Sequence, residues 1–375
     1  MAIRFRRFTK RFLIICNTGI AFFFLLACLA PYLNPQHWWL ISFLGIGFPF
    51  LLVAVIVFLV WWLFVRRKFA WISVSALVLG IKSISVFFAF HIPQKFDYKK
   101  QPGSVRVASW NVARFIEMKR NNNKGSQTRL QMMDLIQKQD ADIFCMQEFF
   151  HSNDSAWYPN LAYIQSHFNY PYHYYSHDVD GDNHFIGSII FSRYPIIDSG
   201  MVRYPRPSLP EALMHCDIKV NDDTIRVFTT HLQSHQLYKS DYEKIDRIKD
   251  AGGELISDSK TIFSKLKRGI INRKLQVDIV KKVLEDSPYP FLFCADLNDV
   301  PNSYTYFTIR GDMQDAFLKK GFGVGRTFAA LSPTLRIDYI FADDHFRVSQ
   351  VNRVVRNYSD HPGRSYQRMP SAIFS

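Results

Sequence analysis

The sequence predicts an α/β domain preceded by an N-terminal bundle of three transmembrane helices. Three long stretches before residue 93 are apolar with a single lysine among them, and after residue 103 short apolar runs alternate with amphipathic helical patterns. Such alternation is typical of α/β domains. With 48% apolar and 21% charged residues, the chain of 375 residues can build a core and is not disordered. Five cysteines in this length exclude a disulfide scaffold.

The formal net charge of +14 is unevenly distributed along the chain. Residues 1–102 contain 12 basic residues and one acidic residue, whereas residues 103–375 contain 34 basic and 31 acidic residues. The basic excess therefore belongs to the N-terminal third. The C-terminal part lacks the strong positive charge that is typical of a nucleic-acid-binding face.

The apolar stretches cover residues 12–33, 38–65 and 69–92. At a rise of about 1.5 Å per residue, about 20 residues cross a hydrocarbon core of about 30 Å, so each stretch can span a membrane. The third contains Lys82, whose amine must reach the interface, face a partner helix or line a polar pocket. The first is longer than the ~7–15-residue apolar region of a signal peptide, which favours a retained span.

Basic residues beside the stretches predict their orientation. Eight lie before the first stretch or between the second and third, whereas three follow the third. Because cytoplasmic flanks carry the excess of basic residues, three spans predict a cytoplasmic N-terminus and a C-terminal domain on the external or periplasmic side. This orientation depends on the third span. Residues 1–92 would thus form the membrane region, and residues 93–102 would link it to the rest of the chain.

Strand and helix patterns follow one another beyond this linker. Residues 127–139 have the periodicity of an amphipathic helix, and the charge-rich residues 241–282 predict another helix. The predicted strands cover residues 105–111, 142–147, 184–191, 224–230, 290–295 and 336–341.

Polar side chains gather at the ends of these strands and near the C-terminus. They are Asn111, Glu148, His231, Asp296, Asn298, Asp338, Asp360 and His361. Oxygen ligands with one or two histidines, without the Cys/His spacing of a zinc site, fit Mg²⁺ or Mn²⁺ better than Zn²⁺. Because Mg²⁺ usually acts on phosphate oxygens, the pattern indicates phosphate chemistry.

Seven short motifs give this pattern a more specific meaning. They are SWNV at 109–112, QE at 147–148, GSIIFSRYPI at 187–196, TTHL at 229–232, ADLND at 295–299, RIDYIF at 336–341 and SDH at 359–361. The ordered set resembles the endonuclease/exonuclease/phosphatase family, which includes DNase I-like nucleases, neutral sphingomyelinases and inositol polyphosphate 5-phosphatases. Ala295 and Leu297 depart from the Gly and Phe usual in that family, and residues 362–368 stand where its last strand normally begins.

The resemblance implies a fold and a domain boundary. Residues 103–375 would form the catalytic domain, a four-layer αββα sandwich of the DNase I type. In this fold two mixed β-sheets lie face to face with helices outside, and the active site lies at one edge of the paired sheets.

The resemblance also implies a metal site and a base. Glu148 would be the direct ligand of Mg²⁺ or Mn²⁺, with Asn111 beside it and Asp360 in support. A phosphodiester repels anionic nucleophiles, so a cation is needed to neutralise it. Asp296 would align and deprotonate the attacking water.

The remaining residues would act on the phosphate. Asn298 would form a hydrogen bond to it, and His361 would contact the scissile phosphate while Asp338 orients the imidazole. His231 would stabilise the pentacovalent phosphorane or assist the leaving group. Preorganised donors of this kind stabilise the charge that develops in the transition state.

The sequence therefore predicts a membrane-anchored, Mg²⁺-dependent phosphoester hydrolase in which metal-activated water attacks phosphorus. Anchoring in a lipid bilayer favours a phospholipid or a lipid-linked phosphate as substrate. The alternatives are a membrane-tethered nuclease acting on nucleic acid, a hydrolase of a soluble phosphorylated metabolite, and a catalytically silent binding domain. The weak net charge of residues 103–375 argues against a strong nucleic-acid groove, and the intact acidic and histidine positions argue against a silent domain.

Overall fold

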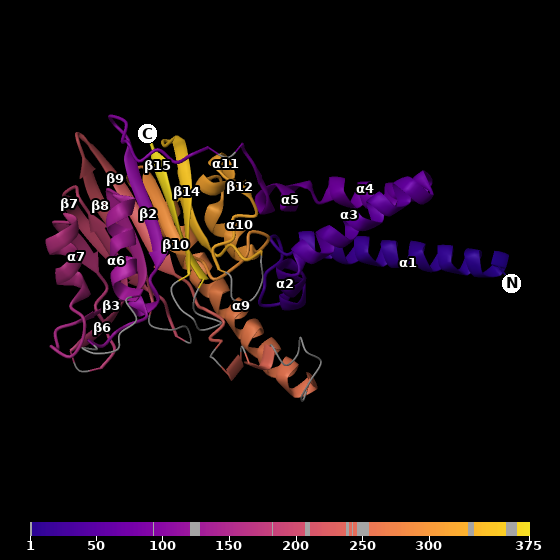
Figure 1. Ribbon diagram of the computed structural model, residues 1–375, viewed down its shortest axis with the longest axis horizontal. Coiled ribbons are helices and arrows are strands. Elements are labelled where there is room, and N and C mark those ends of the chain that lie inside the picture. Colours follow the sequence, from indigo (N-terminus) through magenta and orange to yellow (C-terminus); the bar gives the residue numbers. More distant parts are fainter. Residues whose placement is uncertain are drawn as a thin grey trace. The chain divides into compact units, whose positions relative to one another are not determined.

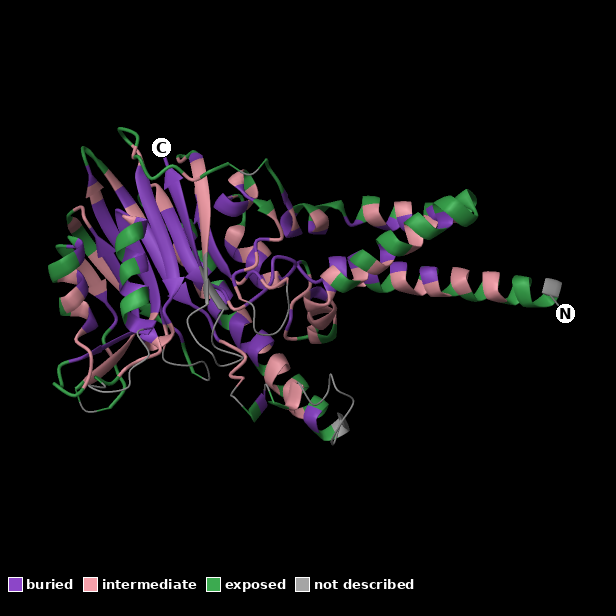
Figure 2. Ribbon diagram, in the orientation of Figure 1, coloured by how far each residue is buried: buried purple, intermediate pink, exposed green. Residues whose placement is uncertain are grey.

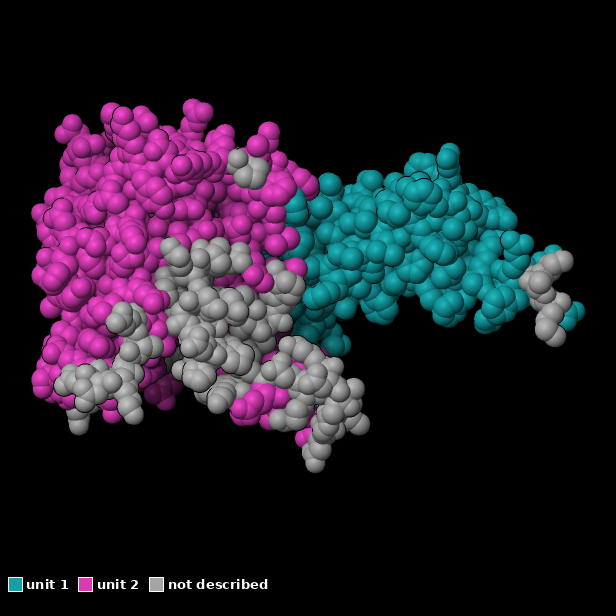
Figure 3. Space-filling view, viewed as in Figure 1, with its two compact units in different colours: residues 1–88, 299–308 teal, residues 89–298, 309–375 magenta. Residues whose placement is uncertain are grey.

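The computed structural model describes residues 2–92, 94–120, 128–181, 183–206, 211–237, 240–241, 243–245, 255–328, 334–357 and 366–375. The chain divides into two compact units, coloured separately in Figure 3. The helical unit comprises Met1–Phe88 and Asp299–Thr308, and the sandwich unit comprises Ala89–Asn298 and Ile309–Ser375. Each unit has its own core.

Apolar helices build most of the helical unit. α1 (Ala2–Cys28) and α3 (Phe48–Val65) are long and apolar enough to cross a membrane. The segment formed by η1 (Arg67–Phe69) and α4 (Ala70–Leu79) is followed by α5 (Ile81–Phe87) at a bend of 65°. Among the described residues there are thus two candidate spans, or three if this bent pair is a single span.

Glycines lie at both breaks between these helices. The second predicted stretch forms α2 (Trp39–Ile46) and α3, which are separated by Gly47. Pro49 in the first turn of α3 has no N–H to continue the hydrogen-bond ladder of α2, so a new helix begins there. Gly80 separates α4 from α5, and a Cβ at Gly80 would lie only 2.6 Å from the Phe24 ring of α1. The absence of a side chain therefore permits this close approach.

Polar and aromatic contacts hold the helices together. Ser73 Oγ donates a hydrogen bond of 3.0 Å to Asn17 Oδ1, and both side chains are fully buried. In helices that span a membrane, such bonds contribute about 0.6–2 kcal/mol each. Phe24 stacks on Phe48 with ring centroids 5.4 Å apart, and Phe48 meets Phe87 edge-on at 5.7 Å.

The sandwich unit contains two large mixed β-sheets (Figure 1). The seven-stranded sheet has the order β14-β15-β2-β3-β6-β4, with β5 paired to β6. Its strands are β2 (Val105–Asn111), β3 (Ile143–Ser152), β4 (Tyr172–Tyr175), β5 (Asp178–Val179), β6 (His184–Ser192), β14 (Val348–Asn357) and β15 (Tyr366–Phe374).

The six-stranded sheet has the order β11-β13-β10-β9-β8-β7. Its strands are β7 (Ile196–Arg203), β8 (Ala212–Val220), β9 (Asp223–His231), β10 (Phe291–Asp296), β11 (Gln314–Asp315) and β13 (Asp338–Ala342). A separate two-stranded sheet pairs β1 (Ala89–Phe90) with β12 (Phe322–Gly323).

The central strands of the two large sheets are buried on both faces, as the purple strands in Figure 2 show. Because side chains alternate along a strand, each sheet contributes one face to a shared apolar layer. This inter-sheet layer includes Val107, Ile143, Cys145, Ile190, Cys216, Val227, Leu292, Cys294 and Ile340. The opposite face of the seven-stranded sheet packs against α6 (Thr128–Gln139) and α7 (Asn160–Phe168).

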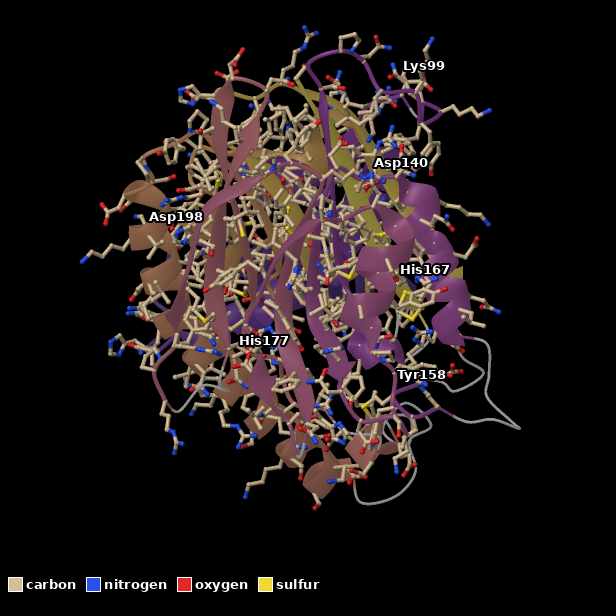
Figure 4. The ribbon with its side chains drawn as sticks, turned by 90° about the vertical axis from the view of Figure 1, so that its left-hand side faces the viewer. Lys99, Asp140, Tyr158, His167, His177 and Asp198 are labelled. Atoms are coloured by element: carbon tan, nitrogen blue, oxygen red, sulfur yellow. The ribbon has the colours of Figure 1, made fainter. Side chains whose placement is uncertain are left out.

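Helices cover both outer sides of the paired sheets in Figure 4, where His167 marks α7. α9 (Leu255–Glu285) buries Val277, Val280 and Leu284. This four-layer αββα arrangement confirms the predicted fold class. The remaining helices are short: η2 (Ala113–Phe115), α10 (Tyr304–Arg310) and α11 (Ala316–Lys320).

The described part of the predicted linker is bonded to the sandwich unit. The backbone N–H of Asp97 donates to Gln350 Oε1 at 2.8 Å, and the carbonyl of Tyr98 accepts a hydrogen bond from Arg106. The pairing of β1 with β12 precedes these contacts in the chain. The segment therefore lies along the sandwich unit instead of spanning open solvent.

Arg106 lies on β2 and is fully buried. Its guanidinium caps the C-terminal end of α6. Its Nη1 donates to the backbone carbonyls of Gln139 at 3.1 Å and Asp140 at 3.2 Å. The last carbonyls of a helix have no partner inside the helix, so the guanidinium supplies the missing donors. Arg106 thereby joins the outer helix layer to the sheet.

We expect Arg106→Gln to lower the free energy of unfolding by about 2 kcal/mol, because buried carbonyls lose their donor. Arg347→Gln, at an exposed position, should change it by no more than about 0.5 kcal/mol. The measurement is thermal unfolding of both full-length variants in detergent, followed by tryptophan fluorescence. An unchanged melting temperature for Arg106→Gln would contradict this role.

Candidate active site

The ends of five strands bring the predicted residues to one edge of the sandwich. β2 and β3 are parallel with Asn111 opposite Gln147, so their carboxyl ends lie together. β9 and β10 are also parallel, with His231 opposite Asp296. The antiparallel strand β13 begins at the same edge, where Asp338 lies opposite Asp296. Asp296 therefore stands between His231 and Asp338 in one sheet.

The Asn111 amide joins the two sheets at this edge. Its Nδ2 donates hydrogen bonds of 3.1 Å to Glu148 Oε1 and of 3.1 Å to Asp296 Oδ2. Its Oδ1 accepts a hydrogen bond of 3.0 Å from the backbone N–H of Ala113, which fixes the orientation of the amide. A single buried side chain thus holds two carboxylates from different sheets beside each other.

Glu148 lies in a bulge of β3. The register with β6 shifts between Met146 and Phe149, and Glu148 has a φ of +49°, which is uncommon for a residue with a side chain. A bulge redirects a side chain out of the regular alternation. As a result, 36% of the Glu148 side chain is exposed, whereas its neighbours Gln147 and Phe149 are fully buried.

Asp296 and Asn298 are held by the backbone of the following loop. The backbone N–H of Asn298 donates to Asp296 Oδ1 at 2.9 Å, and Asn298 Nδ2 donates to the carbonyl of Leu232 at 2.9 Å. Burial raises the pKa of Asp296, while His231 and Asn111 oppose this shift. One of the two amide protons of Asn298 is engaged with Leu232, which leaves the other for a ligand.

His231 has a carboxylate partner that the sequence analysis missed. Its Nδ1 lies 3.0 Å from Glu211 Oε1, and its Nε2 lies 3.7 Å from Asp296 Oδ2 and 3.9 Å from Glu148 Oε1. Burial lowers the pKa of His231, but Glu211, Asp296 and Glu148 together raise it to about 10. These carboxylates therefore favour the imidazolium form of His231.

Glu211 reaches this position because it directly precedes β8. β8 is antiparallel to β9 with Leu213 opposite Thr230, so the start of β8 lies beside the end of β9. The only sign of Glu211 in the sequence is that an acidic residue stands directly before an apolar run. It becomes meaningful only when the pairing of these two strands is known.

Asp338 is buried at the start of β13. Its backbone N–H donates to Thr327 Oγ1 at 3.1 Å, and burial beside Asp296 raises the pKa of its carboxyl well above the ordinary value. The predicted partner His361 and the predicted metal-supporting residue Asp360 lie outside the described residues. The structure therefore brings together six of the eight predicted residues, namely Asn111, Glu148, His231, Asp296, Asn298 and Asp338.

The donor set fits a hard divalent cation. Glu148 and Asp296 offer carboxylate oxygens around one amide nitrogen, and Glu148 is partly exposed. Mg²⁺ is usually bound by one or two carboxylates together with phosphate oxygens of the substrate. Another acidic group, formed by Asp343, Asp344 and His345, follows the opposite end of β13 and is largely exposed.

Two mixed sheets packed in a four-layer sandwich, with a polar site at one edge, are the features of the DNase I-like phosphoesterase fold. The chain belongs to the endonuclease/exonuclease/phosphatase family, whose sequence profile matches residues 108–361. The profile of a domain of unknown function matches residues 10–87. No curated protein matches the chain.

Several solved structures are similar to this chain. An endonuclease/exonuclease/phosphatase protein from Beutenbergia cavernae is 18% identical, with 72% of this chain and 71% of that chain covered and a TM-score of 0.49. The catalytic domain of human Nocturnin with bound sulfate is 14% identical, with 72% and 94% covered and a TM-score of 0.47. Truncated TDP2 from Caenorhabditis elegans is 14% identical, with 74% and 99% covered and a TM-score of 0.46.

Gly187 of β6 provides a test of the bulge, because it pairs with Phe149 next to Glu148. Its φ is +151°, and a Cβ there would lie 1.9 Å from Ser176 Oγ. We expect Gly187→Ala to lower the free energy of unfolding by about 2–3 kcal/mol through strain and overpacking. Gly311→Ala is the matched control, since Gly311 also has a positive φ but a Cβ there meets no atom within 4 Å.

The measurement is chemical denaturation of both full-length variants beside the wild type. Gly311→Ala should cost about 1 kcal/mol, the usual penalty for a side chain in the left-handed region. Equal destabilisation by the two substitutions would contradict a tightly packed Gly187.

Proposed function

We propose that this protein is a divalent-metal-dependent hydrolase of phosphodiesters in lipids or lipid-linked compounds, acting at a membrane surface. The observation that supports it most strongly is the Asn111 amide between the Glu148 and Asp296 carboxylates. Membership of the family supports phosphoester hydrolysis, and the apolar helices α1 and α3 support attachment to a bilayer.

The chain's own residues provide the proton transfers for hydrolysis. Asp296 accepts a proton from the attacking water, whose oxygen forms the new bond to phosphorus. The bond between phosphorus and the leaving oxygen breaks, and the leaving oxygen receives a proton from Nε2 of His231. Glu211 keeps the imidazole oriented for this step through its contact with Nδ1.

Two further roles complete the proposal. The second amide proton of Asn298 donates to a phosphoryl oxygen. Glu148, with Asn111 beside it, would hold Mg²⁺ or Mn²⁺, which when bound would neutralise charge on the phosphoryl and leaving oxygens. Asp338 borders Asp296 and, as the resemblance to the family implies, would orient His361, while Asp360 would support the metal.

The membrane helices favour a lipid substrate over a soluble one. Helices that span a bilayer would hold the chain where phosphodiester headgroups are abundant, and the small net charge of residues 103–375 offers little attraction for a nucleic-acid backbone. We also propose three spans, with the N-terminus in the cytoplasm and the sandwich unit on the external or periplasmic side.

Substitution of the proposed base should remove most of the activity. We expect Asp296→Asn to lower kcat by about 10²–10⁴-fold, the usual contribution of a general base. Glu211→Gln should lower it by about 10–100-fold, as is typical for residues that orient an imidazole. The measurement is hydrolysis by the full chain in nanodiscs, with Mg²⁺ or EDTA, of phospholipid vesicles and of plasmid DNA in parallel.

The matched control is Asp344→Asn, at a carboxylate whose side chain is 94% exposed, and this variant should keep wild-type activity. Metal-dependent release of a phosphorylated headgroup supports the proposal. DNA nicking alone would favour a tethered nuclease. Equal activity of Asp296→Asn and the wild type would contradict the assigned base.

Labelling of single engineered cysteines tests the orientation. Ser375→Cys, at an exposed position, should react with a membrane-impermeant maleimide on intact cells, whereas Phe5→Cys should react only after permeabilisation. The native Cys28, Cys145, Cys216 and Cys294 are buried and Cys16 lies within α1, so background labelling is low. Labelling of both termini from the same side would show an even number of spans.

A further inference from the structure

Positive charge in the sandwich unit is concentrated in α9. This helix, Leu255–Glu285, contains eight basic and three acidic residues. Residues 103–375 as a whole contain 34 basic and 31 acidic residues, so outside α9 they contain 26 basic and 28 acidic residues. The helix is therefore a local cationic element in a domain that is otherwise close to neutral.

The N-terminal part of α9 carries its exposed side chains on one side of the helix. With about 3.6 residues per turn, these side chains form a continuous stripe. We call this stripe the outer face of α9, and it consists of Lys260, Phe263, Ser264, Lys267, Arg268, Ile271 and Leu275. All of them are exposed or partly exposed. The opposite side is buried at Asp258, Gly269, Asn272 and Arg273.

The outer face combines basic and apolar residues without acidic ones. Between Leu255 and Val277 the sequence contains one acidic residue, Asp258, and its side chain is buried on the opposite side of the helix. Phe263 is 38% exposed and Leu275 is 36% exposed, so apolar side chains stand among the cations. This combination is typical of helices that lie on a membrane surface.

The loop that follows His231 fixes α9 at the edge of the candidate site. The backbone N–H of Gln233 donates to Gln276 Oε1 at 2.8 Å, and Arg273 Nη1 donates to the carbonyl of Gln233 at 2.9 Å. Both hydrogen bonds are buried, so the middle of the helix is held beside the end of β9. From there the N-terminal part of α9 extends beyond the strands of the sandwich unit (Figure 1).

Anionic phospholipid is the partner that fits this surface best. Each basic residue close to an anionic bilayer strengthens binding by about fivefold, and the long stems of Lys and Arg let their apolar neighbours reach the acyl boundary. Nucleic-acid phosphates would also attract the cations, but the aliphatic Ile271 and Leu275 have no partner on a sugar–phosphate backbone. A bilayer uses both kinds of side chain.

We propose that the outer face of α9 binds the surface of an anionic phospholipid bilayer. Because α9 contacts the loop after His231, this binding brings the edge of the candidate site next to lipid headgroups. The inference goes beyond hydrolysis, since a docking surface needs no turnover. It applies to any bilayer of this charge, including one that the chain's own apolar helices do not occupy.

A fluorophore on the outer face reports this binding. Ser264→Cys, at an exposed position, is labelled with a polarity-sensitive dye in the full chain, which is held in nanodiscs of neutral phosphatidylcholine. Added vesicles that contain phosphatidylglycerol should shift the emission to the blue, and vesicles of phosphatidylcholine should not. About 1 M salt, at which the Debye length is about 3 Å, should abolish the shift. The same dye in Glu285→Cys, at the last residue of α9, should not respond.

Charge reversal on and off the outer face tests the assignment. Lys260→Glu combined with Arg268→Glu should raise the vesicle concentration at half-maximal shift by at least about 25-fold, about fivefold for each cation lost. Lys281→Glu combined with Lys282→Glu is the matched control, because both residues are exposed on the same helix. They lie about 20 Å or more along the helix from Arg268, beyond the Debye length, so this variant should stay within about threefold of the wild type.

Phe263→Ser tests the apolar part of the surface. It should raise the half-maximal vesicle concentration by about tenfold, because a buried aromatic contact with lipid is lost. Equal losses in the two double variants would show that overall charge attracts the vesicles, and the inference would be wrong. A shift with phosphatidylcholine vesicles would also overturn it.

Nucleic acid is the competing partner in the same assay. A shift with an oligonucleotide at lower concentration than with anionic vesicles, unchanged by Phe263→Ser, would assign the surface to nucleic acid and overturn the inference. The assay contains no turnover. An inactive wild type would therefore contradict the proposed function and leave this test unaffected.

Discussion

The apolar layer between the two β-sheets is the constraint on which the rest of the sandwich unit depends. Strands such as β2 and β10 are buried on both faces, so a shift by one residue would exchange the side chains of the two packed layers and disrupt the packing of both. The register of the parallel pairs is therefore strongly fixed. Because it is fixed, polar residues at the carboxyl ends of these strands meet at one edge, where Asn111 can bond to carboxylates from both sheets.

Much of the fold and of this edge could be predicted from the sequence, because three of the residues there end apolar runs. Asn111 and Asp296 are the last residues of buried strands, and His231 ends another. Periodicity does not indicate which strands lie together. That expectation came from the order of the seven motifs, through their resemblance to a known family. Asp360 and His361 fall outside the described residues, so their roles stay predictions. The remaining features depend on pairings across the chain.

Three of these features show why. Glu211 contacts His231 only because β8 runs antiparallel to β9, and nothing in the local sequence reports that register. The bulge at Glu148 depends on the pairing of β3 with β6. Hydropathy located the apolar helices, but it could not show that the segment Asp299–Thr308 packs with them, because that segment is anchored by specific contacts and not by an apolar pattern.

The link between β1 and the last apolar helix has a consequence for how substrate is encountered. α5 ends at Phe87 and β1 begins at Ala89, so one residue separates them. A free linker of ten residues would span a root-mean-square distance of about 17 Å and let an anchored domain sample a volume of solution. Here the residues after β1 are hydrogen-bonded to the sandwich unit, so they do not behave as a free linker. If the apolar helices span a bilayer and the substrate is a lipid, as proposed above, encounters would depend on lateral diffusion of lipid toward the protein, and collision frequency would become a property of membrane fluidity.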